Sequence, residues 1–342
     1  MGSFFINKVL LLPYYIILKF RHYLYDTGFL KSYKFDIPII IVGNISAGGT
    51  GKTPHTEFIV EHFLSKGVVA VLSRGYGRKS KGFRYVTIDD TALISGDEPL
   101  QIKRKFPEAI VAVDANRVRG IKTLMALPKE KRPSVIVMDD AFQHRRVTPS
   151  LNIVLIDYSR PIDSDNLLPI GSLRDLPEQI VRADIVIVTK CPLEMSPDEQ
   201  FVWRNSLMLN SNQELFFSAM KYSEAKAIFP EGDKRYIYSN FAQIVTAIAN
   251  PKPLENELLS RYKIIKKLHY RDHKNFSKRD AALLNQMALK SPKAVIFTTE
   301  KDAQRIISLN SLSNQLKLRL FYLPIEVAIL NDKSEHFFNL MG

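Results

Sequence analysis

The chain has 342 residues, 46% of them hydrophobic and 24% charged, with a formal net charge of +13. Its length favours two lobes over one, and its apolar content suffices for a packed core. The single cysteine, Cys191, excludes a disulfide framework and indicates a reducing compartment. The large positive charge indicates an anionic partner, such as a nucleotide or a lipid surface. We expect no nucleic acid as a partner, because the basic residues are scattered and form no known binding module.

An apolar run, VLLLPYYIIL at 9–18, lies near the start of the chain between basic residues. The run is too short to cross a bilayer, which takes about 20 residues. A signal peptide fits poorly, because no small-residue cleavage site follows. We expect residues 1–36 to hold a helical segment at a membrane surface, with apolar side chains among the acyl chains and Lys and Arg at the headgroups. A helix packed on the protein's own core is the alternative.

A strand, a glycine-rich turn and a helix follow in that order. The apolar run 37–42 predicts a buried strand, and the sequence GNISAGGTGKTP at 43–54 then ends in the Gly-Lys-Thr of a phosphate-binding loop. Backbone N–H groups of such a loop cradle phosphate oxygens, while Lys52 would reach the β- and γ-phosphates and Thr53 would offer its hydroxyl to Mg²⁺. The full template of this loop has glycine at the position of Ser46, five residues before Gly51. The predicted nucleotide-binding residues are Ser46, Ala47, Gly48, Gly49, Thr50, Gly51, Lys52 and Thr53.

Beyond this loop, short runs rich in Val and Ile alternate with helical stretches. Continuous apolar runs are typical of strands buried on both faces of a parallel sheet. The predicted strands are 68–74, 83–88, 109–114, 134–139, 152–158 and 183–190, and the predicted helices are 55–66, 98–106 and 115–127. This alternation predicts a P-loop NTPase-like α/β fold, with a doubly wound, mainly parallel sheet that binds ligands at the carboxyl ends of its strands.

After residue 190 the pattern loosens. A capping box predicts a helix at 196–212, and short strand-like pieces follow at 214–220 and 235–238. A second series then predicts a smaller α/β lobe, with strands at 244–249, 264–270, 294–299 and 318–323 and a helix near 277–290. We therefore expect an N-terminal segment at 1–36, a nucleotide-binding domain at 37–212 and a smaller domain at 213–342.

Two acidic motifs are candidates for chemistry. The strand that ends in Asp139 and Asp140, within VIVMDDAFQHR, would supply the acidic partner of Mg²⁺, directly or through water. The SGDEP motif places Asp97 ahead of a helix, where it would be either the N-cap or a general base for an incoming hydroxyl. Its spacing alone favours the cap.

Two arginines and a histidine complete the candidates. Arg117 in NRVRG and Arg174 in LLPIGSLRD could each stabilise charge on a transferring phosphoryl group, although a lone arginine is more often a surface residue. His273 lies between charged residues ahead of a helix and by itself indicates no role. The VTKCP motif is similar to a guanine-reading element, but Pro192 replaces its aspartate, so we expect ATP rather than GTP.

In this order the motifs resemble those of the tetraacyldisaccharide 4′-kinase family, the lipid A 4′-kinases. The resemblance covers most of the chain and rests on VGNISAGGTGKTP, SRGYGRKSKG, SGDEP, NRVRG, DDAFQHR, LLPIGSLR, IANP, the Asp-His pair at 272–273 and TTEKDA. Several of these motifs are weak alone, but their co-occurrence in this order is highly specific. The family carries a hydroxyl residue at the position of Ser46, so that departure fits.

The resemblance implies a two-lobed, monotopic enzyme on the cytoplasmic face of the bacterial inner membrane. It implies transfer of the ATP γ-phosphoryl group to the 4′-hydroxyl of a tetraacylated glucosamine disaccharide 1-phosphate, with ATP and Mg²⁺ as cofactors. It also assigns Asp97 as base, paired with His273 of the other lobe, which reverses the helix-cap interpretation. The expected partners are the acylated disaccharide phosphate lipid and an anionic membrane surface, and we expect a monomer.

Two other classes of function remain open from the residues. A P-loop NTPase that drives metallocentre or complex assembly shares the Gly-Gly-x-Gly-Lys-Thr core, but such proteins commonly have lysine where this chain has Ala47, and they bring metal-binding Cys and His clusters. A membrane-surface scaffold that only senses nucleotide is the other alternative. The acidic pair, Asp97 and His273 argue against it.

Overall fold

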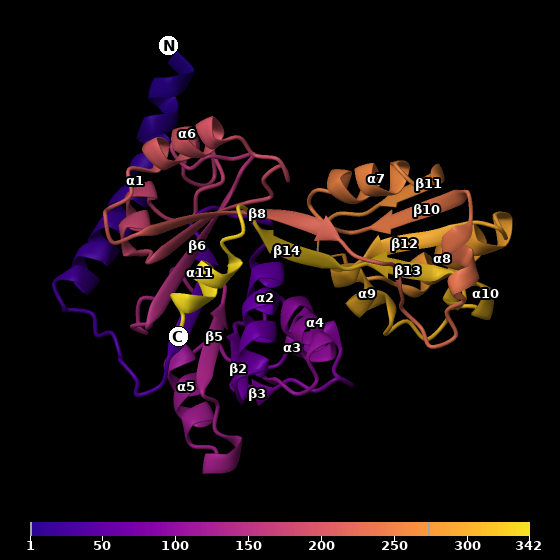
Figure 1. The fold of residues 1–342 in the computed structure, drawn as a ribbon, viewed down its shortest axis with the longest axis horizontal. Helices are drawn as coiled ribbons and strands as arrows, with labels where there is room; N and C mark the ends of the chain where they lie inside the picture. Colours follow the sequence, from indigo (N-terminus) through magenta and orange to yellow (C-terminus); the bar gives the residue numbers. More distant parts are fainter. Residues whose placement is uncertain (1, 273) are drawn as a thin grey trace.

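The computed structural model describes residues 2–272 and 274–342, so His273 lies outside the described residues. The chain forms two α/β lobes that lie side by side, as Figure 1 shows. Two neighbouring strands run from the larger lobe toward the smaller one and are the connection between them.

The larger lobe is built on a nine-stranded sheet whose central strands are parallel. Both edges are antiparallel, with β3 against β4 at one and β14 against β8 at the other. In spatial order the strands are β14 (Ile325–Ile329), β8 (Glu214–Tyr222), β7 (Ile185–Thr189), β6 (Leu151–Asp157), β1 (Ile39–Asn44), β5 (Val135–Asp139), β2 (Val69–Ser73), β4 (Ile110–Val113) and β3 (Arg84–Tyr85).

Buried apolar side chains form one cluster on each face of this sheet, because its central strands are apolar throughout. The helices of the larger lobe are α2 (Lys52–Leu64), α3 (Ala92–Ser95), α4 (Asp97–Lys105), α5 (Arg117–Met125), α6 (Pro197–Leu207) and α11 (Ser334–Asn339). The predicted fold class, a doubly wound and mainly parallel sheet with a second smaller lobe, is confirmed.

The smaller lobe has a five-stranded sheet that is parallel except at its β9 edge. Its strands in spatial order are β11 (Lys263–His269), β10 (Phe241–Thr246), β12 (Val295–Thr299), β13 (Leu320–Leu323) and β9 (Lys226–Ala227). Its helices are α7 (Lys252–Leu259), α8 (Lys278–Lys290), α9 (Glu300–Ile306) and α10 (Asn314–Lys317). The piece at 235–238 that the sequence predicted as strand-like is a 3-10 helix, Lys234–Tyr238.

The division between the lobes differs from the predicted boundary after residue 212. Strands β8 and β14 complete the larger sheet, and α11 packs on it through Phe337, which contacts Phe58 of α2 and Phe216 of β8. The chain therefore leaves the larger lobe along β8 and returns to it along β14. We propose residues 223–324 as the smaller lobe, with 325–342 assigned to the larger one.

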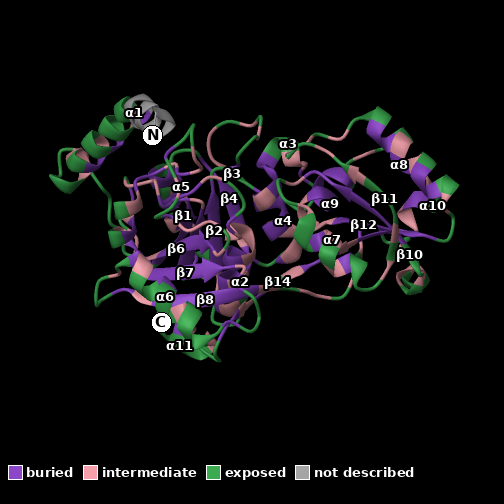
Figure 2. Cartoon of the chain, turned by 90° about the horizontal axis from the view of Figure 1, so that it is seen from above, coloured by how far each residue is buried: buried purple, intermediate pink, exposed green. Residues whose placement is uncertain are grey.

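The N-terminal helix α1 (Gly2–Asp26) has two different faces beyond residue 10. Leu11, Leu18 and His22 are buried against the larger lobe, whereas Leu12, Ile16, Ile17, Phe20 and Tyr23 are exposed, as the outer face of α1 in Figure 2 illustrates. The sequence offered membrane contact and core packing as alternatives, and α1 has a packed face as well as an exposed apolar one. Among the described residues, no helix combines the length and the apolar character needed to cross a bilayer.

Candidate active site

The glycine-rich loop links the carboxyl end of β1 to the first residue of α2. Gly48 and Gly51 adopt positive φ angles of 97° and 87°, which favour glycine, and a Cβ on Gly51 would displace the terminal methyl group of Met220. The buried His55 ring then holds the end of the loop that joins α2. Its Nδ1 lies 2.8 Å from the Gly51 carbonyl oxygen, and its Nε2 lies 2.9 Å from Ser218 Oγ. Burial lowers the pKa of His55 to about 4, so this ring is a neutral support at physiological pH.

Side chains from neighbouring strands hold the loop from outside. Thr189 Oγ1 donates to the Thr50 carbonyl at 2.8 Å, and Lys190 donates to the Gly49 carbonyl while it pairs with Asp157 at 2.6 Å. The VTKCP motif that resembled a guanine-reading element therefore contributes loop support through its Thr and Lys. Sequence reasoning missed this role, because the loop and this motif are far apart in the chain.

Lys52 and Arg174 converge on Asp140. Lys52 Nζ lies 3.7 Å from Asp140 Oδ1, and the Arg174 guanidinium donates to both carboxylate oxygens of Asp140 and to Asn44 Oδ1. Burial raises the pKa of Asp140, but the bonds from Arg174 and the charge of Lys52 outweigh it and leave that pKa below the ordinary value. Burial lowers the pKa of Lys52, and the negative charge of Asp140 opposes that shift. Asp140 is therefore an ionised anchor for both cations.

Asp139, at the end of β5, is the more deeply buried of the two carboxyl groups. Burial first, and then the charges of Asp140 and Glu98, raise the pKa of Asp139 to about 7, while Lys52 and a 3.3 Å hydrogen bond from Thr56 Oγ1 oppose the shift. A carboxylate destabilised in this way gains from a nearby cation.

The donor set fits Mg²⁺. Among the described residues, no three His, Cys, Asp or Glu side chains gather to hold a metal ion by themselves. Mg²⁺ is usually held by one or two carboxylates together with phosphate oxygens and water, which matches Asp139, Asp140 and the half-buried Thr53 beside a phosphate-binding loop.

Arg117, in the first turn of α5, lies at the same carboxyl end of the parallel strands as Asp139 and Asp140. It is buried, and Nη1 donates to the Asp114 carbonyl at 2.8 Å, whereas the buried Nε has no hydrogen-bond partner among the described residues. Burial lowers the pKa of Arg117 to about 10, and the carboxylates of Asp139 and Asp140 oppose that shift. A buried guanidinium with an unused donor beside two carboxylates is suited to an anion such as a phosphoryl group.

Asp97 lies at the junction between the two lobes. It is the first residue of α4, the N-cap position belongs to Gly96, and no side chain caps that helix, so the helix-cap interpretation does not hold. Both carboxylate oxygens of Asp97 accept hydrogen bonds from Arg305 of α9 in the smaller lobe. The charge of the next residue, Glu98, acts on Lys52 and on Asp139, so the start of α4 faces the edge that carries the phosphate-binding loop.

Comparison with known proteins decides the family. The family model described as Tetraacyldisaccharide-1-P 4′-kinase matches residues 6–341. A tetraacyldisaccharide 4′-kinase of Parabacteroides distasonis is 43% identical over 336 residues, which cover 96% of this chain and 91% of the relative. One from Porphyromonas gingivalis is 41% identical over 330 residues, which cover 95% and 92%. The chain belongs to the tetraacyldisaccharide 4′-kinase family.

Membership of this family makes the protein a kinase. The fold agrees with the family assignment. A crystal structure of LpxK from Aquifex aeolicus, in complex with ATP, superposes with a TM-score of 0.71 and covers 98% of this chain and 99% of its own. At 24% sequence identity this likeness shows the shared fold. Both the resemblance derived from the motifs and the prediction of a phosphotransferase are confirmed.

In this family member, α1 packs directly against the edge that carries the phosphate-binding loop. Tyr14 Oη donates to the Arg174 carbonyl at 3.1 Å, and Arg21 Nη2 donates to the Gln143 carbonyl at 2.5 Å. His22 Nε2 lies 2.7 Å from Asp175 Oδ1, and both side chains are buried. These contacts place the packed face of α1 against the segments that carry Arg174 and Asp175.

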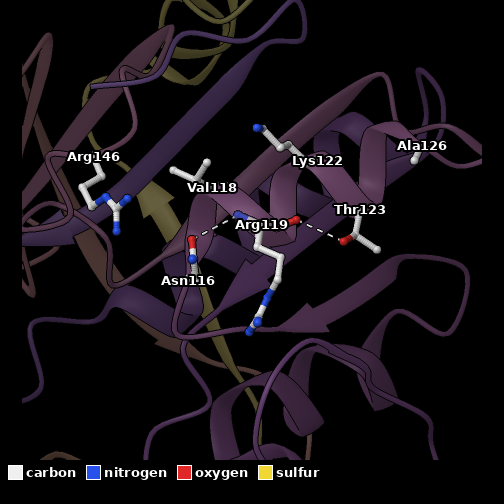
Figure 3. A pocket seen from close by; sticks show the side chains of 7 residues that line it. All are labelled: Asn116, Val118, Arg119, Lys122, Thr123, Ala126 and Arg146. Carbon is white, nitrogen blue, oxygen red and sulfur yellow. Dashed lines mark hydrogen bonds between the residues drawn. The ribbon is translucent and has the colours of Figure 1, made fainter. Parts of the chain in front are cut away.

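The kinase also has an open hollow of about 470 Å³ on the solvent side of α5 (Figure 3). Arg119, which projects into this region, forms a bidentate pair with Asp114 at 2.7 and 2.8 Å. None of the predicted site residues lines the hollow, which is lined by Asn116, Val118, Arg119, Lys122, Thr123, Ala126 and Arg146. We therefore place the chemistry at the phosphate-binding loop and the lobe junction.

Proposed function

We propose that this kinase transfers the γ-phosphoryl group of ATP to the 4′-hydroxyl of a tetraacylated glucosamine disaccharide 1-phosphate. Family membership supports this substrate class. The observation that carries the mechanism is that the start of α4, which holds Asp97, faces the cluster of Lys52, Asp139 and Asp140, because the charge of Glu98 acts on Lys52 and Asp139.

The phosphate-binding loop and its neighbours would bind the nucleotide. Lys52, which lies 3.7 Å from Asp140, would reach the β- and γ-phosphates, and Arg117 would offer its unused Nε to the transferring group. Arg174 donates to Asp140 and would add positive charge beside the phosphates. Thr53, Asp139 and Asp140 would hold Mg²⁺, which neutralises charge on phosphate oxygens when bound.

Asp97 would orient the acceptor hydroxyl and receive its proton. Phosphoryl transfer has a loose transition state, so the base mainly positions the hydroxyl and accepts the proton late. The family resemblance pairs Asp97 with His273, which the sequence places in the smaller lobe ahead of α8. An imidazolium beside Asp97 would favour the ionised carboxylate.

We further propose that the protein is a monotopic monomer at the cytoplasmic face of the bacterial inner membrane. Support comes from α1, whose outer face exposes Leu12, Ile16, Ile17 and Phe20. The exposed Lys31 and Lys34 follow the helix, where they would meet anionic headgroups.

The deciding experiment follows radiolabelled γ-phosphate from ATP into an acylated disaccharide phosphate presented in detergent micelles. We expect labelled lipid whose formation needs Mg²⁺ and the 4′-hydroxyl, and a preference for ATP over GTP. Nucleotide hydrolysis at the same rate with and without the lipid, and no labelled lipid, would instead support the NTPase that drives metallocentre or complex assembly.

A further inference from the structure

We propose that Arg305 is a positioning residue for Asp97: from the smaller lobe it sets the orientation of the base, and so links catalytic competence to the position of that lobe. This inference rests on the proposed role of Asp97 in the transfer. It concerns a residue outside the motifs that identify the family.

The contact between the two side chains is a buried, two-pronged ion pair. Arg305 Nε donates to Asp97 Oδ1 at 2.9 Å, and Nη2 donates to Oδ2. The side chains are only 4% and 10% exposed, although the residues are 208 positions apart. A planar fork that engages both carboxylate oxygens fixes the plane of the carboxylate as well as its place, which a single hydrogen bond cannot do.

Arg305 is in turn fixed by the smaller lobe. Its Nη1 lies 3.3 Å from Asp302 Oδ1, and the other oxygen of Asp302 accepts from the Ala247 backbone N–H and from Thr299 Oγ1, both at 2.8 Å. Ala247 follows β10 and Thr299 ends β12, so Asp302 is tied to the carboxyl end of the smaller sheet. The orientation of Asp97 is therefore set by the smaller lobe through two buried charged residues.

The pair leaves Asp97 able to act as a base. Each carboxylate oxygen has two lone pairs, and the fork uses one on each, so the fork by itself does not prevent Asp97 from accepting a proton. In the described part of the chain, the charged groups near Asp97 include Glu98 on its own helix and Lys301, Asp302 and Arg305 on α9. Arg305 places a positive charge in direct contact with the carboxylate, and its loss should make Asp97 easier to protonate.

The remaining contacts between α4 and α9 offer a matched control. Arg104 Nη1 donates to Gln304 Oε1 at 2.8 Å, so Gln304→Met removes a hydrogen bond between the lobes at the position next to Arg305 without touching Asp97. Arg305→Met removes the charge and the fork at similar volume, and Arg305→Lys keeps the charge but loses the fork.

The test measures kcat and KM for ATP from pH 5 to 9 at saturating Mg²⁺, together with the unfolding temperature of each variant. For Arg305→Met we expect kcat to fall about 100-fold, KM for ATP to change less than about threefold, and the acid limb of kcat to move up by about one pH unit. Arg305→Lys should return the acid limb toward its original position and recover only part of kcat. Gln304→Met should leave kcat and the position of its acid limb unchanged.

Failure of this inference can be told from failure of the proposed function. An active Asp97→Asn would remove the base assignment, and the role of Arg305 would go with it. An inactive Asp97→Asn, combined with normal kcat and an unmoved acid limb in Arg305→Met, would overturn the inference alone. If Arg305→Met does not fold, Arg305→Lys decides, because normal kcat in that variant would exclude a need for the fork.

Discussion

The edge that carries the phosphate-binding loop and the junction between α4 and α9 are built in different ways. The first lies within one lobe, where β1, β5 and their following loops bring Lys52, Asp139 and Asp140 together. The second exists only where two lobes meet, because Asp97 lies in α4 of the larger lobe and Arg305 in α9 of the smaller one. Nucleotide binding can therefore survive a movement of the smaller lobe, whereas orientation of the base cannot.

The largest expected effect tests the site within the larger lobe, which holds the phosphate-binding loop with Lys52, Asp139 and Asp140. Lys52→Ala should lower kcat about 10³-fold or more, because a half-buried cation that would neutralise developing phosphoryl charge is lost. Turnover with and without the lipid acceptor, alongside thermal unfolding, checks this. Lys66→Ala is the matched control, since Lys66 lies beyond the other end of α2 and donates to the Gly342 carbonyl at 3.0 Å. Near-normal turnover in a folded Lys52→Ala would contradict the phosphate-binding assignment.

The next effect tests the junction. Asp97→Asn should lower kcat about 10²–10³-fold with little change in KM for ATP, because the amide keeps the size of the side chain but cannot accept the proton. Steady-state kinetics measure both constants. A rise in KM for ATP that matches the loss in kcat would place Asp97 in nucleotide binding instead, and the contrast between the two regions would fail.

Pairing across the junction can be measured with a double variant. If Asp97 and His273 act as one unit, Asp97→Ala combined with His273→Ala should be little worse than the poorer single variant, because losses within a catalytic unit are not additive. Losses that multiply in the double variant would show that the two residues act separately.

A smaller effect separates the two faces of α1. Replacing the exposed Ile16, Ile17 and Phe20 with Ser should weaken binding to anionic vesicles about 10–100-fold and leave unfolding nearly unchanged. Replacing the buried Leu18 with Ala should instead lower the free energy of unfolding by about 2–4 kcal/mol. Vesicle sedimentation and denaturant unfolding distinguish the faces. Equal sedimentation of the Ser variant and the wild type would place the membrane contact elsewhere.

The smallest expected effect concerns pH and Asp139. Its pKa of about 7 exceeds that of the same group in the unfolded chain, so the folded state binds the proton more tightly. The nucleotide-free, metal-free protein should therefore lose stability as the pH rises from about 4 to above 7. Asp139→Asn should lose less over the same range. Denaturant unfolding at pH 5 and pH 8 with a chelator measures the difference, and equal losses in both proteins would contradict it.

The site within the larger lobe could be predicted because the sequence motifs that form it are local. A glycine-rich turn between an apolar strand and a helix, and an apolar strand that ends in Asp139 and Asp140, specify their own geometry within a few residues. The parallel sheet then brings the carboxyl ends of β1 and β5 together. Helix and strand order in the larger lobe was predictable for the same reason.

The junction could not be predicted in that way. Arg305 lies just beyond the TTEKDA motif, in a helix whose sequence does not reveal a partner 208 positions away. The assignment of β8 and β14 to the larger sheet also depends on pairing between distant segments, which neither strand signals alone. Lys190 was noticed in a motif, but its contact with the Gly49 carbonyl follows from tertiary structure.

The connection through β8 and β14 makes the smaller lobe a continuous insertion in the chain of the larger one. Tyr222 and Ile325, where the chain leaves and returns, are direct neighbours across an antiparallel pair. A tight turn can join such neighbours, so the same sheet could close as a simple hairpin without the intervening residues. The smaller lobe is thus a removable module: its excision should leave a self-contained nucleotide-binding domain, and its exchange between relatives would graft a different partner for the base onto an unchanged phosphate-binding loop.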